Sequence, residues 1–110
     1  YVVRDGDRIL GSYYIKPNAA GPGGHICNCG YMVAAEARGH GVARAMCEHS
    51  QQVARELEFL GMQFNSVVST NTVAIHLWET LGYRTIGTIP KGYKHKQQGY
   101  VDCLIMYKAL

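Results

Sequence analysis

The sequence predicts a single α/β (α+β) domain in which helices pack on a mixed sheet. Three observations predict this fold class. β-rich runs occupy both ends of the chain, a helical repeat of apolar residues separates two of them, and a second helical segment follows. The expected order is β-β-β-α-β-α-β-β. The 110 residues suffice for one domain, 1–110, and 47% of them are hydrophobic, so a core can form.

Three strands are expected before the first helix. Asp5-Gly6 reads as the turn between the apolar start of the chain and a strand over 8–15, which contains Tyr13 and Tyr14. A loop rich in glycine and proline covers 16–24, and 25–33 is the third strand. This strand and a strand over 62–69 flank the first helix, so we expect them to be parallel and joined by a right-handed crossover.

Two helices are predicted from apolar spacing and from their end signals. The first has its apolar positions at Val42, Met46, Val53, Leu57 and Leu60, and Gly61 is expected to stop it. The second is capped by Asn71 or Thr72 and buries one face that includes Trp78. The last two strands are expected over 83–89 and 100–107, separated by a basic loop.

The charge pattern excludes some classes of partner and leaves one question open. A net charge of +3 is too small to indicate a nucleic-acid partner. No apolar run approaches the ~20 residues of a membrane span and no signal peptide is visible, so we expect a cytoplasmic protein without a membrane partner. No acid lies between Glu79 and Asp102, whereas the basic residues there are Arg84, Lys91, Lys94 and Lys96. This stretch is either a solvated loop or a basic rim that attracts an anionic ligand.

The four cysteines indicate free thiols. Cys27, Cys29, Cys47 and Cys103 form no C-x-x-C pair, and we expect them to be buried as small apolar residues. His25 and His40 lie near the first two, but the spacing differs from that of structural zinc sites. We therefore expect no metal.

The most informative segment is Arg38-Gly39-His40-Gly41-Val42-Ala43, which follows a strand and opens a helix. Two glycines let the main chain approach a bulky anion, the N–H groups of the first helical turn point at it, and the helix dipole favours negative charge. Arg38 adds a fork of donors that suits phosphate. Arg44 stands where a dinucleotide-binding fingerprint would have its third glycine, which argues against a nicotinamide cofactor.

This segment resembles the acetyl-CoA motif of the GNAT family of N-acetyltransferases, Arg/Gln-x-x-Gly-x-Gly/Ala, in which Arg38, Gly41 and Ala43 fill the fixed positions. A second block, from Asn71 to Tyr83, resembles the family's helix and the glycine that ends it. The resemblance implies a mostly antiparallel mixed sheet with a splayed central parallel strand pair. It also implies that the family's first strand and helices are missing, so the chain would be N-terminally truncated and its exposed sheet edge would favour a homodimer.

The resemblance assigns the cofactor-binding residues for acetyl-CoA, which acts as co-substrate. Main-chain groups of Met32 and Val33 would pair with the pantetheine arm. Asn71 would contact the cofactor near the second helix, where Trp78 stands in the place of the tyrosine that often serves as general acid. An indole N–H cannot supply that proton, so the thiolate leaves unprotonated, or water or Tyr83 serves. The pyrophosphate would be held by Arg38 and by the amides of Gly39, Gly41, Val42 and Ala43.

The expected reaction is direct attack of a neutral amine on the thioester carbonyl, which a strand N–H would polarise. Asn28 and Asn65, on adjacent apolar strands, are either structural amides or a pair that flanks the cleft and holds the acceptor; we take them as the catalytic candidates. The segments His25–Gly30 and Gln63–Asn65 also resemble fungal enzymes that acetylate proline-like imino acids such as azetidine-2-carboxylate. A small-molecule amine is therefore favoured over a protein acceptor.

The general base stays open. The candidates are His25, Glu36, His40 and His76, and a water relay with an asparagine serves equally well. Asp102 and Tyr100 could reach the acceptor or simply face solvent. A CoA-binding module without turnover is the competing interpretation, because of Trp78 and the short N-terminus. Replacing Gly41 by a bulky β-branched residue is expected to abolish acetyl-CoA binding.

Overall fold

The computed structural model describes residues 1–110, and its contacts divide them into two compact units. The first unit contains residues 1–62 together with Leu110, and the second contains residues 63–109. The order of strands and long helices is β-β-β-α-β-α-β-β, as predicted, with two short 3-10 turns added.

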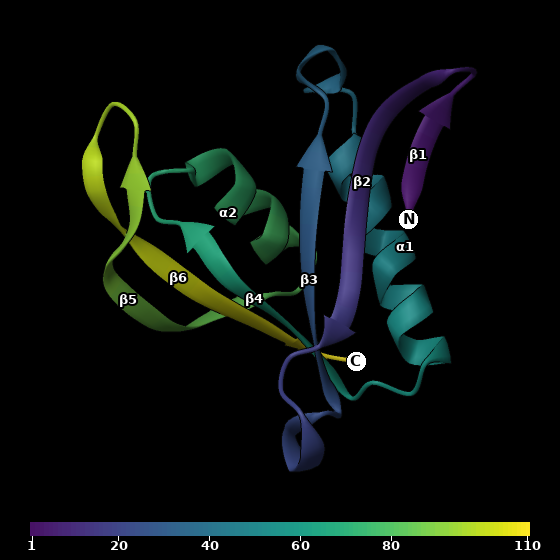
Figure 1. Cartoon of the computed structure of the whole chain (residues 1–110), viewed down its shortest axis with the longest axis vertical. Helices are drawn as coiled ribbons and strands as arrows, with labels where there is room; N and C mark the ends of the chain where they lie inside the picture. Colours follow the sequence, from purple (N-terminus) through teal and green to yellow (C-terminus); the bar gives the residue numbers. More distant parts are fainter. The chain divides into compact units, whose positions relative to one another are not determined.

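The first unit contains three antiparallel strands of the six-stranded sheet, with one helix on them (Figure 1). Its strands are β1 (Val2–Asp5), β2 (Arg8–Pro17) and β3 (Ile26–Val33). β2 pairs with β3 so that Ser12 faces Met32, Tyr14 faces Gly30 and Lys16 faces Asn28. Helix α1 (Val42–Glu56) passes behind β2 in Figure 1 and bonds to Tyr13 of β2 and Tyr31 of β3, so it covers one face of these strands, and the other face carries no helix of this unit.

The core of the first unit lies between α1 and the covered face of the sheet. A Cβ at Gly11 of β2 would come within 2.9 Å of Met46 Cε and 3.0 Å of Val42 Cγ1, so the glycine lets the helix approach closely. Cys27, Cys29 and Cys47 are buried there, and Cys103 is buried in the second unit. The prediction that the cysteines are free and buried is confirmed.

The predicted end of the first helix is wrong. α1 ends at Glu56, Leu57 follows as its cap, and Glu58 adopts a left-handed conformation with φ 67°. Gly61 begins β4 (Gly61–Val68) and stops no helix. Leu57 and Leu60 continue the apolar spacing but are more than half exposed, so no packing holds them in a further turn.

The second unit places its three strands in the order β4-β6-β5, with helix α2 (Thr72–Thr80) between β4 and β5 in sequence. Its centre is an aromatic cluster. The ring of Phe64 stacks on Tyr83 with centroids 4.3 Å apart and meets Trp78 edge-on at 5.1 Å. Aromatic pairs of this kind stabilise beyond their buried area by ~0.5–1.5 kcal/mol each.

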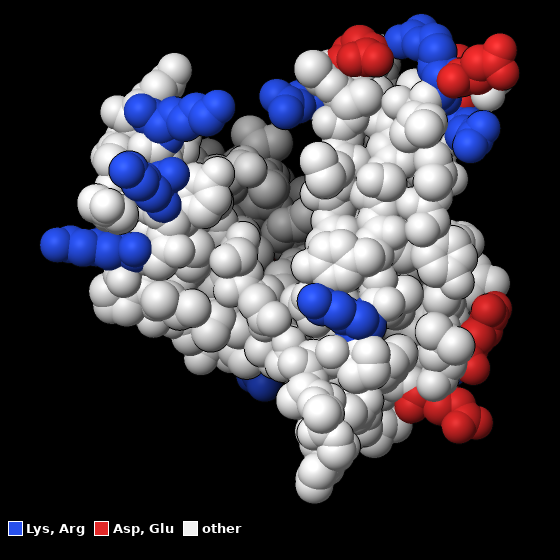
Figure 2. Space-filling view, in the orientation of Figure 1, with Lys and Arg blue, Asp and Glu red and all other residues white.

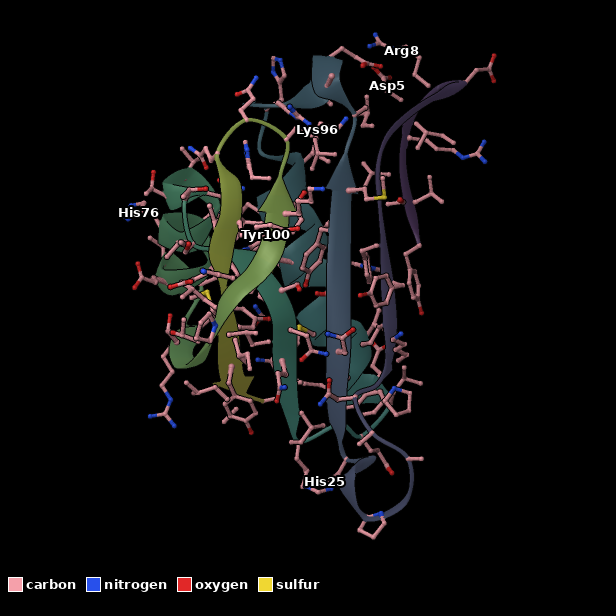
Figure 3. The ribbon with its side chains drawn as sticks, turned by 60° about the vertical axis from the view of Figure 1, so that its left-hand side comes forward. Asp5, Arg8, His25, His76, Lys96 and Tyr100 are labelled. Carbon is pink, nitrogen blue, oxygen red and sulfur yellow. The ribbon has the colours of Figure 1, made fainter.

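The predicted basic loop is wrong, because the segment is a long β-hairpin. β5 spans Arg84–His95 and β6 spans Gly99–Ala109, with a bulge between Ile89 and Tyr93. The turn at its tip is closed by His95, whose Nδ1 accepts the N–H groups of both Gln97 and Gln98 at 3.1 Å. Figure 3 shows Lys96 at this tip and Tyr100 further along β6. Arg84, Lys91, Lys94 and Lys96 are exposed, whereas Lys108 of β6 is half-buried and its Nζ donates a hydrogen bond to Leu81 O at 2.8 Å.

Candidate functional site

The turn between β3 and α1 has the backbone that an anion site needs. A 3-10 turn (Ala35–Ala37) is followed by Arg38 in extended conformation, and then by Gly39 and Gly41 in the left-handed region, with φ 82° and 76°. Only glycine enters this region without steric cost, so both glycines are required by the turn itself. Nothing lies within 4 Å of a Cβ built at either glycine, so the space above the turn is open.

The main-chain donors of this turn are left without partners in the protein. Gly41 is the N-cap of α1 and has no side chain that could cap the helix, and the first helical bond runs from Ala45 N–H to Gly41 O at 3.0 Å. Arg38 and His40 donate N–H bonds at 3.4 Å to carbonyls within the preceding turn. No bond of this kind uses the N–H groups of Gly39, Gly41, Val42 and Ala43. These are the four amides that the sequence assigns to the pyrophosphate.

The charged side chains around the turn leave Arg38 available. Glu36 forms an ion pair with Arg8 at 3.8 Å, and Arg44 pairs with Glu48 one helical turn on at 3.4 Å. The guanidinium of Arg38 is in neither pair and is exposed. An exposed arginine beside unsatisfied amides and a helix N-terminus gives this end of the unit a positive potential suited to a diphosphate.

The uncovered face of β2 and β3 holds the first acceptor candidate. Asn28 is only 4% exposed, and its Oδ1 accepts a hydrogen bond from the Tyr14 hydroxyl at 3.1 Å. The Tyr14 ring lies over Gly30, where a Cβ would come within 2.5 Å of Tyr14 Cε2. A hollow of about 290 Å³ lies beside this pair, lined by Ser12, Tyr13, Tyr14, Gly30, Tyr31 and Met32. Met32 itself is 76% exposed. Asn28 is thus held in place by a residue that the sequence did not single out.

The covered face packs against α1, and burial disfavours ionisation of thiol and phenol groups on it. Burial raises the pKa of the Cys27 thiol to about 12 and that of the Tyr13 hydroxyl to about 12. Burial likewise raises the pKa of Tyr31, whose hydroxyl lies 2.7 Å from Ser50 Oγ. The Tyr13 hydroxyl lies 2.6 Å from Nδ1 of His49. These bonds tie the sheet to α1.

The three candidates in the second unit have different surroundings. Asn65 is exposed and accepts a hydrogen bond from Gln63 Nε2 at 2.8 Å, whereas Asn28 is buried. Asn71 caps α2 as predicted, because its Oδ1 accepts the Ala74 N–H at 3.2 Å. Trp78 is 8% exposed within the aromatic cluster of the second unit. Packing in this cluster therefore explains why a large aromatic residue occupies position 78.

The base candidates are exposed and scattered. Glu36 is paired with Arg8, and His40 lies in the glycine turn. His25 lies at the end of β3 opposite that turn, and His76 points outward from α2 (Figure 3). No group of three or more His, Cys, Asp or Glu side chains is arranged to hold a metal ion, and neither helix is long and apolar enough to cross a membrane.

A helix whose N-terminus opens behind two left-handed glycines, at the end of a strand, can bind an anion such as a diphosphate. Comparison with known families identifies the class of protein. The model of the acetyltransferase (GNAT) family matches residues 1–83, and the chain belongs to this family. Members of the family use acetyl-CoA as co-substrate.

Individual relatives support the same family. The chain is 38% identical over 98 residues to N-acetyltransferase aca1 of Schizosaccharomyces pombe. The aligned residues cover 88% of this chain and 47% of that protein. The solved structure of a GCN5-related N-acetyltransferase from Kribbella flavida has a TM-score of 0.89 and 47% identity, over 93% of this chain and 61% of that one. The chain therefore spans about half to three-fifths of the length of these relatives.

A more distant structure shares the fold. The ribosomal-protein-alanine N-acetyltransferase of Brucella melitensis matches with a TM-score of 0.87 and 24% identity, over 99% of this chain and 67% of that one. The predicted mixed α/β fold of the family is confirmed by this likeness and by the one to the Kribbella flavida structure.

Proposed function

We propose that the protein transfers the acetyl group of acetyl-CoA to the amine or imino nitrogen of a small molecule by direct attack. The observation that carries this proposal is a set of four main-chain N–H groups that bond to nothing in the protein, under open space and beside Arg38: those of Gly39, Gly41, Val42 and Ala43. Donors fixed in this way can bind a diphosphate without reorganisation, because the fold already holds them in position.

The remaining cofactor contacts are those that the resemblance to the family implies. Main-chain groups of Met32 and Val33 would bind the pantetheine arm, and Asn71 and Trp78 are the other implied contacts. The thioester would then reach the uncovered face of β3 near Gly30, beside the hollow that Tyr14 borders.

In the proposed step, the neutral nitrogen of the acceptor attacks the thioester carbonyl carbon. A C–N bond forms, the C–S bond breaks and CoA leaves as thiolate, while the proton of the nitrogen passes to a base or to water. Asn28 and Asn65 would orient the acceptor. Most of the acceleration would come from positioning and from a main-chain N–H that polarises the carbonyl.

We further propose an acceptor of the proline-like imino acid type. The proposal has support from the segments His25–Gly30 and Gln63–Asn65, and from the burial of Asn28 on the uncovered face.

The test is a mass-spectrometric screen of amines and imino acids after incubation with acetyl-CoA. An acetylated product whose formation requires the protein supports the proposal. A competing function, a CoA-binding module without turnover, is favoured by the burial of Trp78 where a general acid often stands. Retention of acetyl-CoA with no product from any amine would establish the module and refute the transferase. Acetylation of peptide N-termini alone would establish a protein acceptor instead.

A further inference from the structure

The uncovered face of β2 and β3 presents a short strip of side chains beside the hollow. Because facing residues of an antiparallel pair project to the same side, the register puts three pairs on this face in sequence along the strands: Ser12 with Met32, Tyr14 with Gly30, and Lys16 with Asn28. The strip contains no acidic residue. Figure 2 shows the same face, which is uncharged over most of the middle of β2 and β3.

Tyr14 is held in this strip but remains accessible. The absence of a side chain at Gly30 leaves room for the Tyr14 ring over β3, and the hydroxyl donates a hydrogen bond to Asn28 Oδ1 at 3.1 Å. The side chain is nevertheless 52% exposed. Because the hydroxyl hydrogen is used in the bond to Asn28, the phenolic oxygen can act toward a ligand as an acceptor of an N–H group.

Lys16 is a cation without an anionic partner. Its Nζ lies 5.3 Å from the centroid of the Tyr14 ring, and it takes part in neither of the two ion pairs of the chain. The side chain is exposed, and its flexible stem lets the ammonium move over the strip. The strip therefore combines a hydrogen-bond acceptor for an amine with a cation one strand repeat away.

We propose that Lys16 binds a carboxylate of the acceptor, so that the substrate is an amino or imino acid whose nitrogen lies next to its carboxylate. This inference rests on the acetyl transfer proposed above and names its substrate class. The nitrogen lies against the Tyr14 hydroxyl, facing the thioester, and the carboxylate lies against the ammonium of Lys16. The hollow of about 290 Å³ is at the small end of ligand sites, which suits one amino acid rather than a peptide.

The charge of Lys16 also favours the reactive form of the nitrogen. A cation close to an amine disfavours protonation of that amine, and only the neutral form attacks a thioester. In a free amino acid the carboxylate stabilises the ammonium form; pairing the carboxylate with Lys16 removes that stabilisation. A peptide N-terminus has an amide in place of the carboxylate, so it would lack the charge-assisted bond to Lys16.

The experiment compares acids with their carboxamides. A set of amino and imino acids that includes azetidine-2-carboxylate and proline, and the carboxamide of each, is incubated with acetyl-CoA and the wild-type protein. For each acid that is a substrate, we expect kcat/KM to be at least 10-fold higher than for its carboxamide. Lys16→Gln should lower kcat/KM for the acid about 10-fold, mainly through KM, and leave the amide unchanged, because a charge-assisted bond is lost only with the acid.

Two further variants serve as controls. Lys16→Arg should retain most of the preference for the acid, because it keeps the cation. Arg4→Gln removes one exposed positive charge from β1 and should leave kcat/KM unchanged for both the acid and the amide. An acid-to-amide ratio that Lys16→Gln does not alter, or a wild-type preference for the amides, would overturn the carboxylate site.

Failure of the proposed function has a different signature. If neither the acids nor their carboxamides are acetylated, the proposed transferase activity is refuted. The carboxylate site at Lys16 is then tested separately, by calorimetric binding of the acids to the protein in the presence of CoA. Binding that Lys16→Gln abolishes supports it, whereas absent binding or equal binding to the variant overturns it.

Discussion

The replacement of Gly41 by alanine isolates the anion site from the fold that carries it. Gly41 has φ 76°, and a Cβ built there meets nothing within 4 Å, so the only cost within the protein is the left-handed backbone. That cost is about 1–2 kcal/mol for a residue with a Cβ. A β-branched residue would add side-chain strain at the same position, so alanine is the cleaner probe.

The effect on acetyl-CoA should be larger than the effect on stability. The new methyl group would occupy space that a diphosphate must enter to reach the amides of Val42 and Ala43. Loss of one hydrogen bond to a charged group corresponds to ~1.5–3 kcal/mol, or roughly 10- to 150-fold in Kd. We expect Gly41→Ala to weaken acetyl-CoA binding by at least 10-fold in isothermal titration calorimetry.

Gly6→Ala is the matched control. Gly6 has φ 61° and equally open surroundings, but it lies in the turn between β1 and β2. Urea denaturation should show a similar loss of unfolding free energy for the two variants, while only Gly41→Ala loses affinity. An affinity of Gly41→Ala within twofold of the wild type, at equal loss of stability, would refute the assignment of the pyrophosphate to this turn.

Three other outcomes are expected. Gly30→Ala should displace the ring of Tyr14, break its bond to Asn28, lower the free energy of unfolding by about 1–2 kcal/mol and raise KM for the acceptor, with acetyl-CoA affinity unchanged as measured by calorimetry. Trp78→Ala should lower the unfolding free energy by ~3 kcal/mol or more in urea titrations, because it empties the centre of the aromatic cluster; a loss below ~0.5 kcal/mol would contradict a core role. Above pH 9 the unfolded chain releases protons that the folded state retains on Cys27 and Tyr13, so stability should be complete below about pH 9 and fall by a few kcal/mol as pH rises to 12 in denaturation series; a flat profile would contradict these raised pKa values.

The parts of the fold that could be predicted from the sequence are those determined by interactions between residues close together in the chain. Asn71 is a good helix cap in any context, and the open turn before α1 needs glycines at 39 and 41 whatever surrounds it. The end of α1 could not be predicted in this way. Glu58 takes a conformation that glutamate rarely adopts, whereas Gly61, the expected stop signal, begins a strand.

The hairpin and the acceptor face depend on tertiary structure. Pro90 and Gly92 indicate a loop locally, but β6 supplies the partner that extends β5 to His95 across a bulge. Tyr14 and Lys16 were missed because an exposed tyrosine and lysine are ordinary in a strand. Their one signal was the register, which sets Tyr14 opposite a glycine, and that register is not visible before the strands are paired.

The bulge in β5 has an electrostatic consequence for the whole hairpin. The carboxylate of Asp102 accepts the main-chain N–H of Lys91 at 2.9 Å, and the left-handed conformation of Lys91 (φ 54°) presents that N–H to it. Asp102, the one acidic residue within the hairpin, therefore stabilises the backbone of the bulge through this hydrogen bond. The lysines of this arm form no ion pair with it. At physiological ionic strength their field extends over a screening distance of about 8 Å, and dilution of the salt lengthens it. Anionic solutes should therefore encounter this arm faster in dilute buffer.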